Sequence, residues 1–171
     1  MTIEIFVLRL VHVLGGIFWV GTALFMSLFL APALAASGPS AGQIVGTLQR
    51  RGLMKLLPLV AVLTIASGMR LMWITSAGLS SAYFASATGR TLAGAGVAAV
   101  GAFFVGLFVS RPAGMRSARL AASLAGAPEE QRASIASEIA RLRRRNEVGS
   151  NVVVALLVLG AAGMAVARYL R

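Results

Sequence analysis

Residues 3–31 read IEIFVLRLVHVLGGIFWVGTALFMSLFLA, and only Glu4, Arg9 and His12 among them are ionisable. A membrane hydrocarbon core about 30 Å thick is crossed by about 20 helical residues, so this stretch is long enough to span it. Three more apolar stretches of that length follow. We therefore expect an all-α fold, an integral membrane four-helix transmembrane bundle with spans at about 3–31, 54–74, 91–109 and 148–169. Pro32 is expected to end the first span, and Arg111-Pro112 to stop the third.

The composition supports this prediction. The 171 residues are 58% hydrophobic and 12% charged, with a mean hydropathy of +0.84, whereas an average soluble domain is about a quarter charged. The net charge of +11 would suggest nucleic acid in a soluble protein, but no nucleic-acid-binding motif is present and we expect no nucleic-acid partner. The chain has no cysteine, which excludes disulfides, thiolate metal sites and cysteine nucleophiles.

Three connections join the predicted spans. Residues 37–53 are expected to hold a short interfacial helix, and residues 75–89 a polar loop with Tyr83 as an aromatic anchor. The region at about 112–146 is expected to be a cytoplasmic helical extension between spans three and four, broken at Gly126-Ala127-Pro128. Its second helix is amphipathic, and two pairs spaced i, i+3 suit ion pairing, Glu129 with Arg132 and Glu138 with Arg141.

The orientation follows from the positions of the basic residues. Eleven of the sixteen lie in or beside the first and third connections: Arg50, Arg51, Lys55, Arg111, Arg116, Arg119, Arg132, Arg141, Arg143, Arg144 and Arg145. The excess of basic residues in cytoplasmic loops places these two connections inside. Both termini are then expected on the periplasmic or outer side of a plasma (inner) membrane.

Small residues indicate close helix packing. The third span carries Gly94, Ala98, Ala102 and Gly106 at intervals of four, and the fourth carries Gly160 and Gly163. Such stripes let helix backbones approach closely in a membrane. We expect the stripes to pack within the chain, although a second subunit or a flat cofactor is an alternative partner.

One constellation could carry chemistry. His12 lies about nine residues, or about 13 Å, below the outer end of the first span, with Gly15, Gly16 and Trp19 on the same face. Ionisable groups at this depth usually face the bundle interior and have a partner or a function. One interpretation is a neutral His12 bonded to a carbonyl or hydroxyl of a neighbouring helix. The other is a ligand to a flat group, for which the glycine pair would clear space.

Basic and sulfur-containing side chains are expected at the same level. Arg9, Arg70 and Arg168 could pair with the propionates of a haem b that has His12 as an axial ligand, and Met69, Met72 or Met164 could supply the sixth ligand. Copper is the alternative cofactor, because Met69 and Met72 are spaced to share a helix face and soft thioethers suit Cu(I).

The run LRLVHVLGGIFWVG at residues 8–21 and the closing MAVARYL at 164–170 resemble the four-helix membrane proteins of the copper-resistance protein D (CopD) group. They are distantly similar to the membrane protoporphyrinogen IX oxidase family. The matching residues are His12, Gly15, Gly16, Trp19 and Gly21. The first resemblance implies copper uptake or tolerance, and the second implies haem b on the first-span histidine and porphyrinogen oxidation.

Three functions stay open from the sequence: a haem b protein with a redox or electron-transfer role, a CopD-like copper protein, and a cofactor-free accessory subunit of a membrane complex. The sequence does not decide whether the chain is an enzyme. The expected partners are the lipid bilayer and either further copies of the chain or a larger membrane complex.

Overall fold

The computed structural model describes residues 2–170, and every regular element in that range is helical. Four continuous helical rods, Ile3–Ala36, Leu53–Thr75, Ala87–Ser123 and Glu129–Tyr169, are long and apolar enough to cross a membrane. The elements are α1 (Ile3–Phe25), η1 (Met26–Leu30), α2 (Ala31–Ala36), η2 (Gly38–Ser40), α3 (Ala41–Arg50), α4 (Leu53–Thr75), α5 (Ser81–Ala85), α6 (Ala87–Val105), η3 (Gly106–Ser110), α7 (Arg111–Ser123), η4 (Leu124–Gly126), α8 (Glu129–Val166) and η5 (Ala167–Tyr169).

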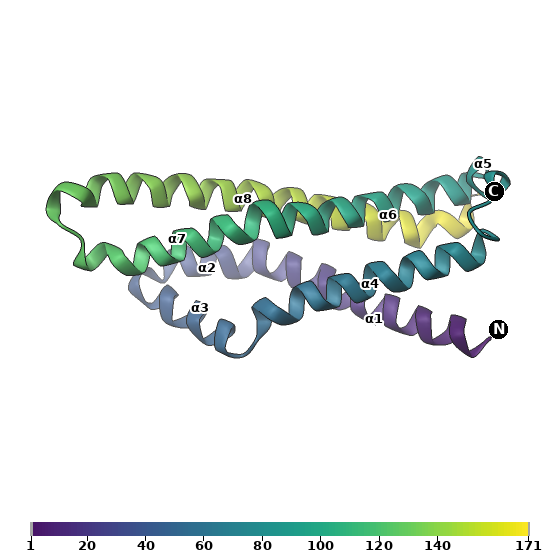
Figure 1. Ribbon diagram of the computed structural model, residues 1–171, viewed down its shortest axis with the longest axis horizontal. Helices are drawn as coiled ribbons and strands as arrows, with labels where there is room; N and C mark the ends of the chain where they lie inside the picture. The colour runs from purple at the N-terminus through teal and green to yellow at the C-terminus, as the bar shows by residue number, and fades with distance from the viewer. Residues whose placement is uncertain (1, 171) are drawn as a thin grey trace.

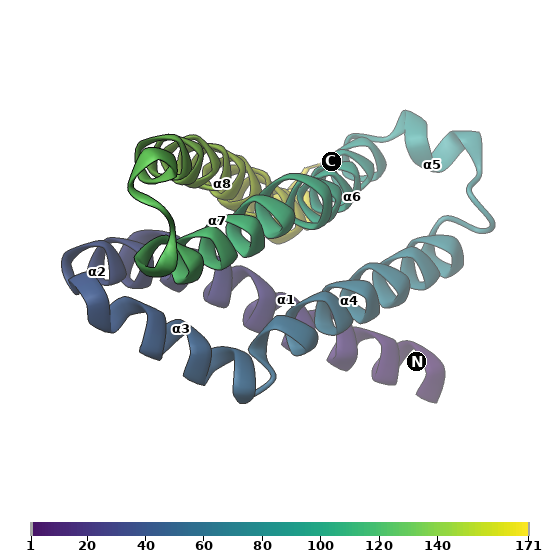
Figure 2. The same ribbon diagram turned by 60° about the vertical axis from the view of Figure 1, so that its left-hand side comes forward.

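The rods form two antiparallel hairpins, α1 with α4 and α6 with α8, that lie against each other (Figures 1 and 2). The start of α1 and the end of α8 lie at the same end of the bundle, the end that carries α5. At the opposite end α7 and α8 extend together beyond the other helices. The helix α3 and the break at residues 126–128 agree with the sequence predictions, whereas residues 75–89, expected to be a polar loop, contain the short helix α5.

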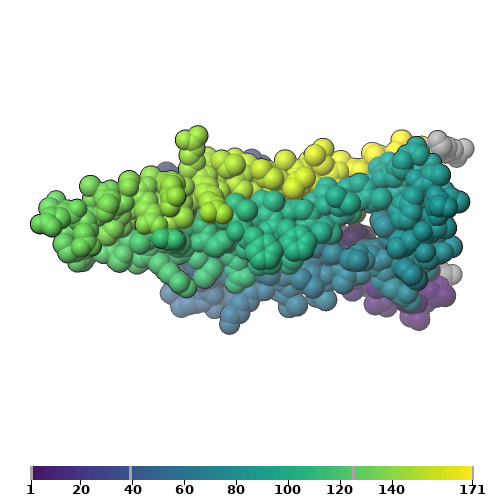
Figure 3. Space-filling model, turned by 45° about the horizontal axis from the view of Figure 1, so that its top comes forward, coloured from purple at the N-terminus to yellow at the C-terminus, as the bar shows by residue number. Residues whose placement is uncertain are grey.

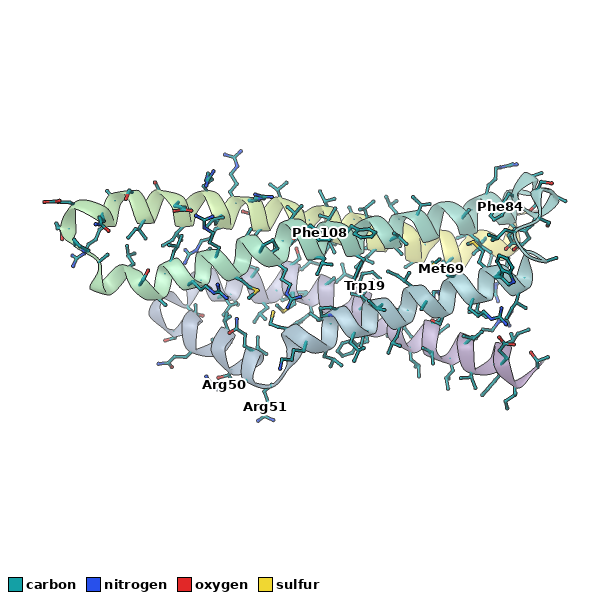
Figure 4. All side chains as sticks on the ribbon, in the orientation of Figure 1. Trp19, Arg50, Arg51, Met69, Phe84 and Phe108 are labelled. Atoms are coloured by element: carbon teal, nitrogen blue, oxygen red, sulfur yellow. The ribbon has the colours of Figure 1, made fainter. Side chains whose placement is uncertain are left out.

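The hairpins meet in a cluster that takes one buried residue from each long helix: Trp19, Ala61, Ala102 and Leu157. Trp19 is only 8% exposed, and the side chains packed against this cluster are alanines, aliphatic residues and Phe103. Figure 4 places Trp19 near the middle of the molecule's length. Because one bulky ring faces two alanines, the helices pack closely around it.

The helices do not end at the prolines as expected. The first rod passes Pro32 and reaches Ala36, and the third passes Pro112 and reaches Ser123. In each rod the π-helical segment η1 or η3 ends two residues before the proline. Since proline lacks an N–H and its ring crowds the carbonyl four residues back, a wider π turn lets the helix continue.

The small residues of the fourth span pack within the chain, as predicted. A Cβ on Gly160 would lie 3.2 Å from the carbonyl oxygen of Ala95, and one on Gly163 would lie 3.2 Å from the Ala95 Cβ. Three of the four residues of the predicted stripe on α6 face the interior or α8: Ala102 is fully buried, Ala98 lies 3.9 Å from a Cβ on Gly160, and a Cβ on Gly106 would lie 3.8 Å from Val153. Gly94 departs from the prediction, because it is exposed with open space beside it, and Ala95 is buried in its place.

The helical extension is held by ion pairs. Arg132 Nη1 lies 2.7 Å from Glu129 Oε2, as the spacing predicted. Glu138 does not pair with Arg141 as expected. It lies 2.6 Å from Arg116 Nη2 on α7, so this ion pair joins α7 to α8 across the hairpin.

Enlarging Ala61 should destabilise the bundle, because its side chain is 2% exposed within the four-helix cluster. We expect Ala61→Leu to lower stability by about 1–3 kcal/mol through overpacking, seen as a lower thermal midpoint in detergent. Ala66→Leu on the exposed face of α4 is the matched control and should leave the midpoint nearly unchanged. Equal midpoints for the two variants would contradict the packing described above.

Candidate functional site

The candidate site lies where α1 crosses α4. His12 Nδ1 lies 2.8 Å from the backbone carbonyl oxygen of Thr64. The imidazole lies against Gly68, where a Cβ would be 2.6 Å from His12 Cε1 and 2.9 Å from Nδ1. A glycine is therefore required on α4 for the ring to reach this carbonyl. The structure thus confirms the interpretation in which His12 is hydrogen-bonded to a carbonyl of a neighbouring helix.

The hydrogen bond fixes the tautomer of a neutral His12. A carbonyl oxygen only accepts, so Nδ1–H is the donor and the lone pair of the ring lies on Nε2. Within residues 2–170, His12 makes this one hydrogen bond, and its side chain is half-buried. Metal-ligating histidines are commonly held in this way, with one ring N–H on a backbone carbonyl and the other nitrogen free to bind.

The predicted glycine pair has a packing partner. A Cβ on Gly15 would overlap Thr64 Oγ1, and one on Gly16 would make an ordinary contact of 3.9 Å with Thr64 Cγ2. Thr64 is 6% exposed, and its hydroxyl donates to the carbonyl of Val60 at 2.8 Å. Gly15 and Gly16 thus bring α1 onto α4, and Trp19, one turn further, belongs to the four-helix cluster.

The predicted arginines differ in their partners. Arg70 pairs with Glu4, with Nη2 2.7 Å from Oε1 and Nε donating to the same oxygen at 2.8 Å. Arg168 donates to the Tyr169 hydroxyl and lies 4.6 Å from the centroid of that ring. Arg9 is exposed and makes no ion pair or hydrogen bond within residues 2–170. Of the three candidate arginines, Arg9 is the one whose guanidinium has no partner among the described residues.

The three candidate methionines do not converge. Met69 is 67% exposed, and Figure 4 labels it on the bundle. Met72 is half-buried, and its Cε would lie 3.8 Å from a Cβ on Gly96 of α6. Met164 is half-buried on α8. Since Gly68 and Met72 are four residues apart on α4, Met72 follows the stripe that His12 contacts.

The sequence reasoning missed the α4 side of the site. Thr64, Ser67 and Gly68 are small or polar residues in the middle of α4, and Thr64 and Ser67 are buried. Ser67 Oγ donates to the carbonyls of Leu63 and Thr64 at 2.7 and 3.0 Å. A small residue four positions from a buried hydroxyl in a membrane-type helix is the signal that could have found this face.

The surface of the bundle is uneven toward the end that carries the termini. Figure 3 shows a hollow between the α4 and α6 regions toward the end that carries the termini, with purple atoms of the N-terminal helix visible at its floor. No group of three or more His, Asp or Glu within residues 2–170 is arranged to hold a metal ion. The potential donor that the α1–α4 crossing itself presents is therefore one imidazole nitrogen. No protein-family model, curated protein or solved structure matches the chain.

Adding a methyl group to Gly15 should separate α1 from α4, because the Cβ would overlap Thr64 Oγ1. We expect Gly15→Ala to lower the thermal midpoint in detergent, and Gly21→Ala on the same helix, with open space beside it, to leave it unchanged or raise it. In the double variant with Thr64→Ala the obstructing hydroxyl is gone, so part of the loss should be recovered, with a coupling energy of about 0.5–3 kcal/mol. Strictly additive effects would show that the two residues do not meet.

Proposed function

We propose that the chain is an integral protein of a plasma (inner) membrane, with four transmembrane spans and both termini on the outer side. Four helices of sufficient length and apolarity support the spans. The concentration of arginines in the first and third connections supports the orientation. The two termini at one end of the bundle agree with an even number of crossings.

Within that membrane, the function best supported is haem b binding through His12 for a redox or electron-transfer role. The observation that carries it is the 2.8 Å bond from His12 Nδ1–H to the Thr64 carbonyl, which leaves Nε2 as a free ligand atom. Bound haem b would supply one-electron chemistry, with its potential set by its axial ligands and surroundings. The α1–α4 crossing would hold the imidazole in one orientation.

Other residues would complete the haem site. Met72 is the favoured sixth ligand among the methionines, because it follows Gly68 on the same α4 stripe while Met69 is mostly exposed. Arg9 is the favoured partner for a propionate, since Arg70 is paired with Glu4. Copper binding is less well supported, because the Met69 and Met72 thioethers lie in different environments.

The haem proposal is tested by optical spectroscopy of protein purified from haem-replete cells. We expect a Soret band with b-type α and β bands, lost in His12→Gly and restored by added imidazole. Restoration by imidazole separates ligation from packing, because a free imidazole can replace a ligand but not the α1–α4 hydrogen bond. Colourless folded wild-type protein would refute the proposal and favour the cofactor-free accessory subunit.

The methionines provide the matched control for the same spectra. Met72→Leu should shift the bands of the reduced protein, because it removes the favoured thioether. Met69→Leu removes a thioether from the exposed face of the same helix and should not. Stoichiometric Cu(I) retained by colourless protein and lost in both methionine variants would support the copper alternative.

Topology can be tested directly, because the chain has no native cysteine. Ser81→Cys on α5 and Ser137→Cys on α8 both replace exposed residues near opposite ends of the bundle. A membrane-impermeant maleimide should label Ser81→Cys in intact spheroplasts, and Ser137→Cys only after the membrane is opened. The reverse pattern would invert the proposed orientation, and labelling of both in intact spheroplasts would contradict the four spans.

A further inference from the structure

A groove of about 490 Å³ lies between α6–η3 and α8, on the side of the Trp19 cluster away from the termini. Its apolar walls come from valines on both rods, and the buried Gly149 keeps its floor low. A Cβ on Gly149 would lie 2.6 Å from Ser110 Oγ, so the two rods touch beneath the groove. The lining residues are Val105, Val109, Arg141, Arg144, Arg145, Val148, Gly149 and Val152.

The groove changes character along α8. Arg141, Arg145, Gly149 and Val152 are spaced i, i+4, i+8 and i+11, so they lie on one face of the helix. The arginines occupy the part toward the helical extension, and the valines occupy the part toward the four-helix cluster. The three arginines and the valines therefore line one continuous surface, and about one helical turn separates the cationic part from the apolar part.

The three arginines face the groove without an acidic partner. Glu138, the expected partner of Arg141, pairs with Arg116 on α7 instead. Within residues 2–170, no carboxylate lies within ion-pair distance of Arg141, Arg144 or Arg145. Clustered cations without counter-charges attract an anion.

We propose that this groove binds one anionic phospholipid, with its phosphate held by the three arginines and one acyl chain lying along the valines. Arginine forms charge-assisted, often bidentate hydrogen bonds to phosphate, and its stem can lie along apolar surface. In the proposed orientation these arginines lie where the cytoplasmic leaflet presents anionic headgroups. The inference rests on the proposed membrane location and is independent of haem.

The shape and chemistry of the groove favour this occupant over others. A free phosphate would use the arginines and leave the valine wall uncovered. A second copy of the chain would need a wider contact, because a volume of about 490 Å³ falls in the range of small-ligand sites, roughly 300–1,000 Å³. A phospholipid carries a phosphate next to an apolar acyl chain, just as the groove carries the arginines next to the valines.

The test is a lipid titration of the purified full chain in neutral detergent, followed by native mass spectrometry. We expect one phosphatidylglycerol to bind more tightly than phosphatidylcholine with the same acyl chains. The triple variant Arg141→Gln, Arg144→Gln and Arg145→Gln should weaken phosphatidylglycerol binding at least tenfold. The matched control, Arg50→Gln, Arg51→Gln and Arg143→Gln, removes the same charge outside the groove and should change binding less than twofold. Figure 4 shows Arg50 and Arg51 at the end of α3, pointing away from the bundle.

A second variant tests the apolar wall with the charges intact. Val148 is 56% exposed, so Val148→Trp should fold, fill the groove and weaken phosphatidylglycerol binding. If the two triple variants lost phosphatidylglycerol affinity equally, binding would depend on overall charge and not on this groove, and the proposal would be overturned. Competition by glycerol phosphate at lipid-like concentrations would show a free-phosphate site, and a dimer dissociated by the groove variants would show a second copy as the occupant; each overturns it.

The same measurements distinguish a missing lipid site from a wrong membrane location. Thermal midpoints of both triples show whether the variants fold. Correct cysteine labelling together with unselective lipid binding refutes the lipid site alone. Recovery of the chain from the soluble fraction refutes the membrane location itself.

Discussion

The hydrogen bond from His12 to the Thr64 carbonyl, and the two glycines that permit it, set the relation between α1 and α4. Gly68 makes room for the imidazole on one side, and Gly15 makes room for the Thr64 side chain on the other. In the proposed membrane, lipid tails would be as apolar as the helix surfaces, so burial alone would not hold such helices together. Close packing and hydrogen bonds do, and the crossing places Trp19 where it meets the second hairpin.

The helices of the second hairpin, α6 and α8, also pack closely, but through small residues. Gly160 and Gly163 of α8 lie against Ala95 of α6. The first rods of the two hairpins are nevertheless alike, because FMSLF at 25–29 and FVGLF at 104–108 each overlap a π segment that ends two residues before a proline. Because both prolines are accommodated, the third rod extends into the α7–α8 arm instead of ending.

Much of the fold could be predicted because it depends on local composition. Long apolar runs predict the four rods, and Gly126-Ala127-Pro128 predicts the break before α8. The errors concern features fixed by distant partners. Proline normally ends a helix, and only the π turn reverses that expectation at Pro32. Glu138 had a suitable partner three residues away, but Arg116 on the neighbouring helix is the one it meets.

The same distinction explains the partial success at the candidate site. An isolated histidine beside two glycines in an apolar helix is unusual enough to be singled out from sequence. Its partner could not be identified, because Thr64 lies 52 residues away and contributes a backbone carbonyl, which every residue possesses. Likewise, Arg70 seemed free because Glu4 lies 66 residues away and no periodicity connects them.

The bond through Nδ1 is compatible with both packing and ligation, so Nε2 is the atom that separates these functions. In the proposed membrane, a histidine that served packing alone would place the Nε2 lone pair in an apolar medium, with no protein donor for it within residues 2–170. An unpaired polar atom in an apolar medium costs free energy. A serine hydroxyl could donate the same kind of bond to a carbonyl with less polar surface. A ligand on Nε2, as proposed above, would remove the cost that the imidazole otherwise carries.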